Sequence, residues 1–341
     1  MILKWLPFTV LLGAACTPAP SRTASEGATA GEVVAAPTQR HAAGPDASPA
    51  AVWPARTRYL SVEVGEQTVF YREAGDPQLP TLLLLHGYPS SSHTYRHLIP
   101  LLSGRFHVVA PDNLGSGYSS RPSPDEEPYT FDGLAEVTAG FVDAVGLDSY
   151  VLYMQDFGAP VGFRLAMARP ERVRGLIAQN ANAYLDGLTP PRQEFFRSAS
   201  EDRSDEKVQA LAKWVSDDAI RETQYLRDVP GERAQFMPPD AWTHDIAMLQ
   251  SESDRRIQVQ LFQDYQSNID AYPRWQEWMR AQTVPALVLW GERDPAFVVA
   301  GARAYLRDLP HATLRLLDAG HFAAEERPVE VAKAIVEVFG R

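Results

Sequence analysis

A carboxylate at a strand-to-helix junction is the side chain in this sequence best suited to act as a nucleophile. Asp156 follows the apolar run Tyr150–Met154 and precedes a helical pattern that begins at Ala159. A sharp turn at such a junction exposes one side chain and directs the N-terminus of the helix at the group it attacks. A carboxylate is already ionised at neutral pH, so it needs no base to activate it. The alternative is that Asp156 only caps the helix, as aspartate often does.

Partners for this nucleophile follow other apolar runs along the chain. Asp294 and His321 each come shortly after such a run, and we expect His321, oriented by Asp294, to activate water. The segment 86–89 (His-Gly-Tyr-Pro) follows the run at 82–85. We expect the backbone N–H groups of Tyr88 and Phe157 to form an oxyanion hole. The sequence therefore predicts a catalytic triad of Asp156, Asp294 and His321.

The elements that must position these residues alternate between short apolar runs and helical patterns. Two runs with a turn at Gly65 predict an antiparallel hairpin, and the remaining runs fit strands buried on both faces of a parallel sheet. Strands that alternate with helices indicate an α/β fold with right-handed crossovers. The predicted strands are 59–64, 68–71, 82–85, 108–110, 150–154, 176–178, 287–290 and 314–317, and the predicted helices are 135–145, 159–168, 300–309 and 329–339.

The alternation is interrupted once, between residues 184 and 280, where long helical patterns rich in aromatic residues take over. We interpret 184–280 as a helical cap inserted into an α/β core that comprises 57–183 and 281–341. The cap carries a series of aromatic residues that we expect to form the core and the wall of an apolar pocket, and hence to bind a small apolar substrate. These residues are Phe262, Tyr265, Tyr272, Trp275 and Trp278.

The N-terminal residues predict export. Residues 1–16 combine a lysine, a short apolar run and small residues, as a signal peptide does. The three residues that end at Cys16 also resemble the lipobox of bacterial lipoproteins, which implies lipidation of Cys16 and a place in the cell envelope. The alternative is an ordinary cleaved signal and a periplasmic or secreted protein. Residues 17–56 are rich in Ala, Pro, Ser and Thr, which predicts a disordered tether.

Charge and composition exclude several kinds of partner. A net charge of −11 disfavours nucleic acid and any electrostatic attachment to an anionic membrane. With Cys16 as the single cysteine, the chain contains no internal disulfide and no cysteine-based metal site. His93 and His97 are spaced as metal ligands on a helix can be, but no carboxylate stands at a matching spacing. We predict no metal and no cofactor, with water as the second reactant.

From about residue 82 to residue 339, the chain resembles the epoxide hydrolases and haloalkane dehalogenases of the α/β-hydrolase superfamily, in the branch with an aspartate nucleophile. The matching segments are 86–89 (HGYP), 111–112 (PD), 115–119 (GSGYS), 155–158 (QDFG) and 318–322 (DAGHF). The resemblance implies an α/β-hydrolase fold, with a mostly parallel sheet flanked by helices and an inserted cap. It also implies a hydrolase that forms an alkyl ester on Asp156.

The resemblance leaves two reactions open. Many haloalkane dehalogenases hold the halide with a Trp after the nucleophile and an Asn in the loop, where this chain has Phe157 and Tyr88. Epoxide hydrolases protonate the epoxide oxygen with cap tyrosines, for which Tyr265 and Tyr225 are the candidates. We favour epoxide hydrolysis to a diol, with haloalkane dehalogenation by the same triad as the alternative. In that case an indole of the cap would be the halide donor, from Trp214, Trp242, Trp275 or Trp278. A binding module without activity is a third interpretation, although such modules commonly lose a triad residue.

Overall fold

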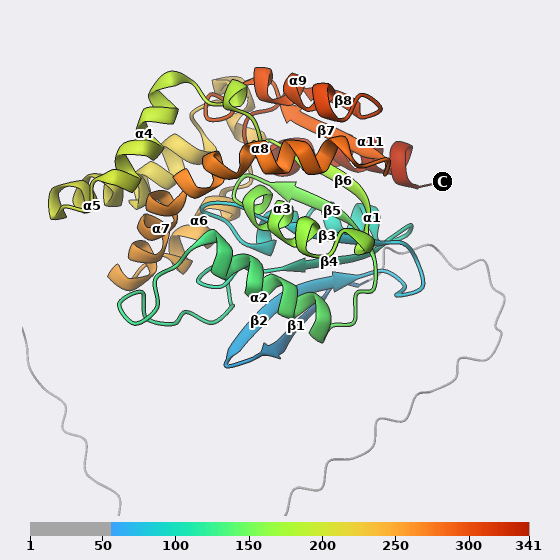
Figure 1. Cartoon of the computed structure of the whole chain (residues 1–341), viewed down its shortest axis with the longest axis horizontal. Helices are drawn as coiled ribbons and strands as arrows, with labels where there is room; N and C mark the ends of the chain where they lie inside the picture. The colour runs from blue at the N-terminus through green and yellow to red at the C-terminus, as the bar shows by residue number, and fades with distance from the viewer. Residues whose placement is uncertain (1–55, 341) are drawn as a thin grey trace, which may run out of the picture. The chain divides into compact units, whose positions relative to one another are not determined.

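The computed structural model describes residues 56–340, so the predicted signal segment, Cys16 and the tether up to residue 55 lie outside it. An eight-stranded sheet runs through the molecule in the order β1-β2-β4-β3-β5-β6-β7-β8 (Figure 1). β1 and β2 pair antiparallel, β2 and β4 pair antiparallel, and the other neighbours are parallel. The strands are β1 (Arg58–Val64), β2 (Gln67–Ala74), β3 (Thr81–Leu85), β4 (His107–Pro111), β5 (Tyr150–Gln155), β6 (Val173–Gln179), β7 (Ala286–Gly291) and β8 (Thr313–Leu317).

Helices cover both faces of this sheet and bury two apolar clusters against it. One cluster contains side chains of α2, α3 and α9, and the other contains side chains of α1 and α11. The predicted α/β class with a mostly parallel sheet is thereby confirmed. The α-helices are α1 (Leu98–Leu102), α2 (Phe131–Ala144), α3 (Gly158–Ala168), α4 (Pro190–Glu201), α5 (Asp205–Ala212), α6 (Pro239–Met248), α7 (Glu252–Asp264), α8 (Gln266–Arg280), α9 (Val299–Asp308), α10 (Ala323–Glu326) and α11 (Pro328–Phe339).

The strands follow the sequence prediction except at the edge of the sheet. β3, β5 and β7 are apolar and almost entirely buried, as continuous apolar runs predict. The hairpin of β1 and β2 turns at Gly65, whose φ of +60° lies in the left-handed region that favours glycine. β8 departs from the prediction, because it pairs with β7 alone and its residues are only partly buried, with Arg315 exposed. An edge strand has a neighbouring strand on one side only, so its other edge remains open to solvent.

Between β6 and β7 every described element is helical, from Leu185 to Arg280. Figure 1 shows α4, α5, α6 and α7 grouped at one end of the sheet. The shorter helical segments there are η3 (Leu185–Gly187), η4 (Lys213–Val215), η5 (Ala219–Tyr225) and η6 (Gly231–Phe236), whereas η1 (Ser92–Tyr95) and η2 (Pro170–Arg172) belong to the rest of the chain. We call the segment 184–280 the cap.

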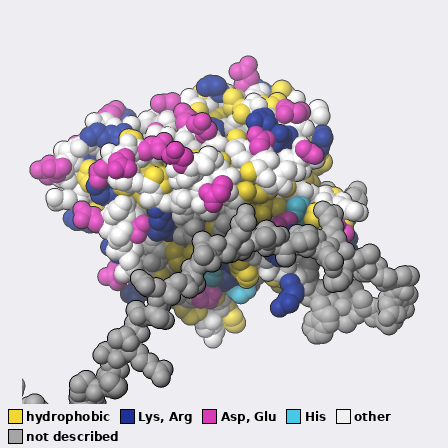
Figure 2. All heavy atoms as spheres, turned by 90° about the horizontal axis from the view of Figure 1, so that it is seen from below, with side chains coloured by type: hydrophobic (Ala, Val, Ile, Leu, Met, Phe, Trp, Pro, Cys, Tyr) yellow, Lys and Arg dark blue, Asp and Glu magenta, His cyan; other side chains and the backbone are white. Residues whose placement is uncertain are grey.

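Ion pairs tie the cap to the rest of the chain. Arg96 binds Asp240 of α6 through Nε at 2.6 Å and Glu325 of α10 through Nη1 at 2.5 Å. Arg121 binds Asp254 at the start of α7 at 2.8 Å. Basic and acidic side chains are interspersed on the face shown in Figure 2. Among residues 56–340, no helix has both the length and the apolar character that crossing a membrane requires.

Candidate active site

The backbone at Asp156 forms a sharp turn between β5 and α3. Asp156 has a φ of +48°, a left-handed conformation that is uncommon for a residue with a Cβ. Two glycines of α3 make the close packing around this turn possible. A Cβ on Gly158 would lie 2.2 Å from the carbonyl oxygen of Leu85, and a Cβ on Gly162 would lie 2.5 Å from Sδ of Met154. The turn presents the Asp156 carboxylate at the carboxyl end of the sheet.

The structure brings Asp156, His321 and Asp294 together at this end of the sheet. His321 Nδ1 lies 2.7 Å from Oδ2 of Asp294, and His321 Nε2 lies 3.5 Å from Oδ2 of Asp156. All three side chains are buried. Asp294 also accepts hydrogen bonds from the side chain of Asn180 at 2.8 Å and from the backbone N–H groups of Ala296 and Phe297. These donors hold the Asp294 carboxylate in the orientation that faces the imidazole.

Charge interactions in this cluster shift the pKa of two groups. Burial opposes a charged His321, but Asp294 and Asp156 outweigh it and raise its pKa from 6.5 to about 10. Burial likewise opposes a charged Asp294, yet His321 and the hydrogen bonds to the carboxylate lower its pKa. The two carboxylates therefore favour the protonated form of His321.

The loop after β3 contacts Asp156 from the other side. The Tyr88 N–H donates to Oδ1 of Asp156 at 2.7 Å, and the Gly87 N–H donates to Oε1 of Gln155 at 3.0 Å. A Cβ on Gly87 would lie 2.3 Å from Cβ of Asp156, so only glycine fits this approach. Within the described residues the Phe157 N–H makes no hydrogen bond to Asp156. Of the two predicted oxyanion donors, Tyr88 is thus in contact with the carboxylate, while Phe157 is its neighbour in the turn.

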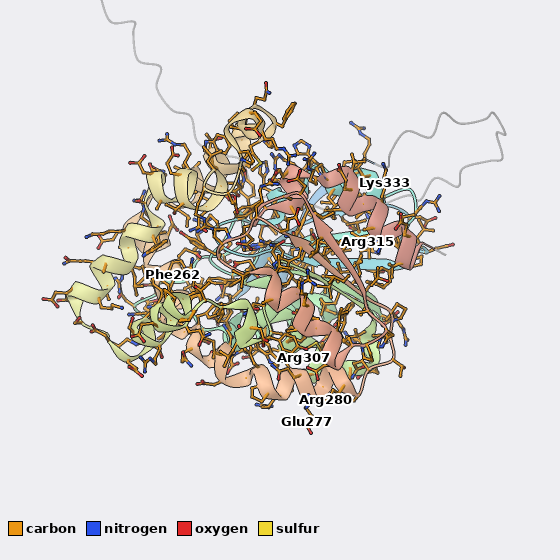
Figure 3. All side chains as sticks on the ribbon, turned by 90° about the horizontal axis from the view of Figure 1, so that it is seen from above. Phe262, Glu277, Arg280, Arg307, Arg315 and Lys333 are labelled. Atoms are coloured by element: carbon orange, nitrogen blue, oxygen red, sulfur yellow. The ribbon has the colours of Figure 1, made fainter. Side chains whose placement is uncertain are left out.

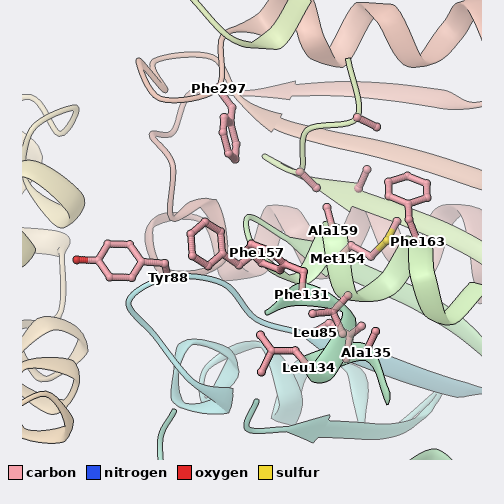
Figure 4. Packing of buried hydrophobic residues seen from close by; sticks show 14 of the residues in the cluster. Leu85, Tyr88, Phe131, Leu134, Ala135, Met154, Phe157, Ala159, Phe163 and Phe297 are labelled. Carbon is pink, nitrogen blue, oxygen red and sulfur yellow. The ribbon is translucent and has the colours of Figure 1, made fainter. Parts of the chain in front are cut away.

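A small cavity of about 30 Å³ opens onto Asp156 and His321. Its size matches one or two water molecules. The hydroxyl of Tyr88 donates to the carbonyl oxygen of Trp214 at 2.8 Å and so links the loop to the cap. Figure 4 shows the Tyr88 ring beside Phe157 with its hydroxyl pointing away from that ring. The lining residues are Tyr88, Asp156, Phe157, Ala296, Phe297 and His321 from the core and Arg192, Phe195, Phe196, Trp214, Gln224 and Phe262 from the cap.

The two cap tyrosines predicted as proton donors do not line this cavity. Tyr225 donates its hydroxyl to Oδ2 of Asp245 at 2.5 Å, and its ring stacks on Phe322. The Tyr225 hydroxyl is therefore hydrogen-bonded to Asp245 and does not line the cavity. Tyr265 lies one layer behind the wall: its ring stacks on Phe196 with centroids 3.8 Å apart. Its buried hydroxyl makes no hydrogen bond of normal geometry within the part of the chain that the structure describes, but it lies beside the hydroxyl of Tyr272. Burial, and then the neighbouring Tyr272, raise the pKa of Tyr265.

Of the four cap tryptophans predicted as possible halide donors, Trp214 lines the cavity and the other three do not. Another lining residue of the cap, Phe262, lies among the cap helices in Figure 3, whereas Glu277 and Arg280 project at the rim of the molecule.

The structure gives no support for a metal site at His93 and His97. The His93 ring stacks on His244, and no group of three or more His, Cys, Asp or Glu side chains within residues 56–340 could hold a metal ion.

Asn180 and Asp228 contact the catalytic candidates directly and are absent from the sequence prediction. Asn180 follows β6 with a φ of +43° and binds Asp294, and Asp228 of the cap accepts the backbone N–H of His321 at 2.9 Å. A polar residue directly after a buried strand could have indicated Asn180, because the carboxyl ends of parallel strands meet at one edge. No motif surrounds Asp228, and its contact depends on how the cap is folded.

The sequence is similar to those of known hydrolases. Residues 80–328 match the family model described as alpha/beta hydrolase fold. An uncharacterized hydrolase of Saccharomyces cerevisiae is 40% identical over 289 residues, which are 84% of this chain and 97% of that protein. Haloalkane dehalogenase 2 of Mycobacterium tuberculosis is 31% identical, over 76% of this chain and 88% of the relative. Epoxide hydrolase A of the same species is 27% identical, over 78% and 92% of the two chains.

A solved structure agrees in fold. The loop variant of haloalkane dehalogenase DbeA from Bradyrhizobium elkanii superimposes with a TM-score of 0.66 at 23% sequence identity. The match covers 82% of this chain and 96% of that chain. At this level of identity the likeness concerns the fold alone, and it confirms the predicted arrangement of a mostly parallel sheet flanked by helices.

Proposed function

Because the chain belongs to the α/β-hydrolase fold family, in the branch with haloalkane dehalogenases and epoxide hydrolases, we propose that it hydrolyses a small electrophile at a saturated carbon. One observation carries this proposal: the two oxygens of Asp156 have different partners. Oδ1 accepts the Tyr88 N–H at 2.7 Å, and Oδ2 faces His321 Nε2 at 3.5 Å. An attacking oxygen and an oxyanion position are thereby separated on a single carboxylate.

The reaction has two steps. Oδ2 of Asp156 attacks the carbon in line with the bond that breaks, and the product is an ester of Asp156. Once His321 has given up its own proton, it removes a proton from water, which attacks Cγ of the ester, and Oδ1 carries the negative charge of the tetrahedral intermediate beside the Tyr88 N–H. Collapse of this intermediate breaks the bond between Cγ and Oδ2, and His321 returns the proton to the departing alcohol. Esterification removes the charge of Asp156, which is one cause of the raised pKa of His321. The imidazole therefore loses its proton more readily when it must act as a base.

We assign the leaving group as the oxygen of an epoxide. The two halide donors usual in dehalogenases are replaced, since Phe157 has no N–H on its ring and the Tyr88 hydroxyl is bound to Trp214. An alkoxide needs a proton, and we assign the phenol of Tyr265, whose buried hydroxyl lies beside that of Tyr272, as its donor. The ring of Tyr265 packs against Phe157 and Phe196 of the cavity wall. A substrate larger than two waters requires these rings to move, and the assignment requires that this movement bring the substrate within reach of the Tyr265 hydroxyl.

Hydrolysis of a carbon–halogen bond is the second candidate. Trp214 lines the cavity and carries an indole N–H that keeps its proton, as a halide donor must. The similarity of this chain to Haloalkane dehalogenase 2 also supports this reaction. The attack by Asp156 and the hydrolysis of the ester would be the same two steps. The two reactions differ in whether the leaving group must be protonated.

The test measures diol formation and halide release by the wild type and by Tyr265→Phe. The substitution should slow epoxide opening on the order of 10²-fold and have a much smaller effect on halide release, because only the alkoxide requires a proton. Tyr225→Phe is the matched control, since it removes a hydroxyl that is bound to Asp245 outside the cavity. Halide release without any diol product, equal in the wild type and Tyr265→Phe, would make dehalogenation the function.

A further inference from the structure

A positive charge without an ionic partner faces the nucleophile. Arg192, in the first turn of α4, lines the same cavity as Asp156 and His321. Within the described residues its guanidinium forms no ion pair and donates no hydrogen bond, whereas Arg96 and Arg121 at the same cap–core boundary are paired with carboxylates. A partly buried charge without a partner costs folding free energy, so its presence at this cavity calls for a ligand that neutralises it.

Aromatic rings hold the guanidinium in place without neutralising it. Its carbon lies 5.5 Å from the ring centroid of Phe195, 5.9 Å from that of Phe196 and 5.7 Å from that of Trp214. All three side chains line the cavity. Contacts of this kind favour a cation over ring faces and fix the plane of the guanidinium. The N–H groups at its edge remain available to an anion.

The charges around the cavity suit a monoanion. The acidic groups near the cavity are Asp156, Asp294 and Asp228, and the basic groups are His321, Arg192 and Arg227, so an incoming carboxylate meets no net repulsion from these groups. Burial lowers the pKa of Arg192, and the nearby cation Arg227 lowers it further. A planar guanidinium binds a carboxylate through two parallel hydrogen bonds, which a single halide ion cannot form.

We propose that Arg192 binds a carboxylate carried by the substrate and so places the electrophilic carbon against Asp156. The substrate class is a short-chain acid with an epoxide, or in the second candidate reaction a halogen, next to the carboxylate. The apolar walls formed by Phe157, Phe195 and Phe262 enclose its hydrocarbon part. This inference rests on the proposed attack by Asp156 and adds the group that selects the substrate.

Two pairs of compounds test this on the full-length protein. Glycidate and glycidamide are epoxides that differ in the charge of one group, and cyclopropanecarboxylate and cyclopropanecarboxamide are their unreactive counterparts. The wild type should favour glycidate over glycidamide in kcat/KM and bind cyclopropanecarboxylate more tightly than the amide by calorimetry. Arg192→Gln should reduce both preferences by about 10- to 100-fold, the range expected for hydrogen bonds to a charged group. Arg192→Lys should recover part of each preference, because a lysine keeps the charge and loses the bidentate geometry.

Arg227→Gln is the matched control, because it removes the same charge from a neighbouring cap residue that does not line the cavity. It should reduce the acid-to-amide preference less than Arg192→Gln does. Equal use of acid and amide by the wild type, or an equal loss on both compounds in Arg192→Gln, would overturn the proposal. Binding of the unreactive acid through Arg192 without turnover of either epoxide would contradict the proposed hydrolysis. The same result would still support Arg192 as a carboxylate-binding residue. If Arg192→Gln does not fold, as judged by circular dichroism, the wild-type preference and Arg192→Lys decide the question.

Discussion

Replacing Gly87 by alanine should impair the second chemical step more than the first. The added Cβ would lie 2.3 Å from Cβ of Asp156, 2.4 Å from its Oδ1 and 2.7 Å from the backbone nitrogen of Phe157. None of these atoms belongs to a long flexible side chain, so the loop after β3 must move away. The Tyr88 N–H would then lose its 2.7 Å contact with Oδ1, the oxygen that carries the charge of the tetrahedral intermediate.

The size of the effect follows from this lost contact. Removal of one oxyanion donor costs about 3 to 4 kcal/mol, which corresponds to a 10²- to 10³-fold slower step. Overpacking of a close contact also costs about 1 to 3 kcal/mol of folding free energy. Single-turnover kinetics with quenching and intact-protein mass spectrometry separate the two steps. The ester of Asp156 should form and then persist in Gly87→Ala, and urea denaturation should show the loss of stability.

Gly104→Ala is the control, because a Cβ on Gly104 would meet no atom within 4 Å. This variant should behave as the wild type in both assays. If Gly87→Ala hydrolysed the ester as fast as Gly104→Ala does, the N–H of Tyr88 would not be an oxyanion donor, and the division of roles between the two Asp156 oxygens would be refuted.

Two further predictions concern stability. The pKa of His321 is raised from 6.5 to about 10 in the folded chain, so its stabilising contribution is complete below pH 6.5 and is lost as pH rises through 10. Urea denaturation at several pH values should therefore show the wild type losing stability relative to His321→Gln over this interval, and parallel curves would contradict it. Gly162→Ala places a Cβ 2.5 Å from Sδ of Met154 and should cost about 1 to 3 kcal/mol. Met154→Ala in the same chain should recover part of that loss, and strictly additive free energies of unfolding would show that the two side chains do not compete for space.

The proximity of Asp156, Asp294 and His321 could be predicted because each residue stands after the carboxyl end of a strand. Asp156, Asp294 and His321 follow β5, β7 and β8, and the topology of a parallel sheet brings these ends together. Local sequence is sufficient for this inference. The partial exposure of β8 differs from the prediction for the run 314–317, in which three leucines suggested a buried strand although Arg315 stands among them.

The cap could not be predicted in the same way. Tyr225 and Tyr265 were selected from short segments, but their surroundings depend on the packing of helices that no local pattern specifies. Tyr225 binds Asp245, which lies twenty residues further along the chain, and Tyr265 stacks on Phe196 of another helix. Local sequence likewise gives no signal for Arg192 or Asp228. Arg192 matters because it lines the cavity, and Asp228 matters because it accepts the backbone N–H of His321.

We predict that Asp156 forms a covalent ester that His321 hydrolyses. The most direct test of this two-step reaction is the intact mass of His321→Gln after incubation with a panel of small epoxides and haloalkanes, followed by peptide mapping. The mass should increase by one substrate-derived group located on Asp156, because attack needs only the carboxylate whereas release needs the base. Asp156→Asn should show no such increase, and the wild type should return to its original mass. Turnover by His321→Gln at the wild-type rate, or an adduct on a residue other than Asp156, would contradict the prediction.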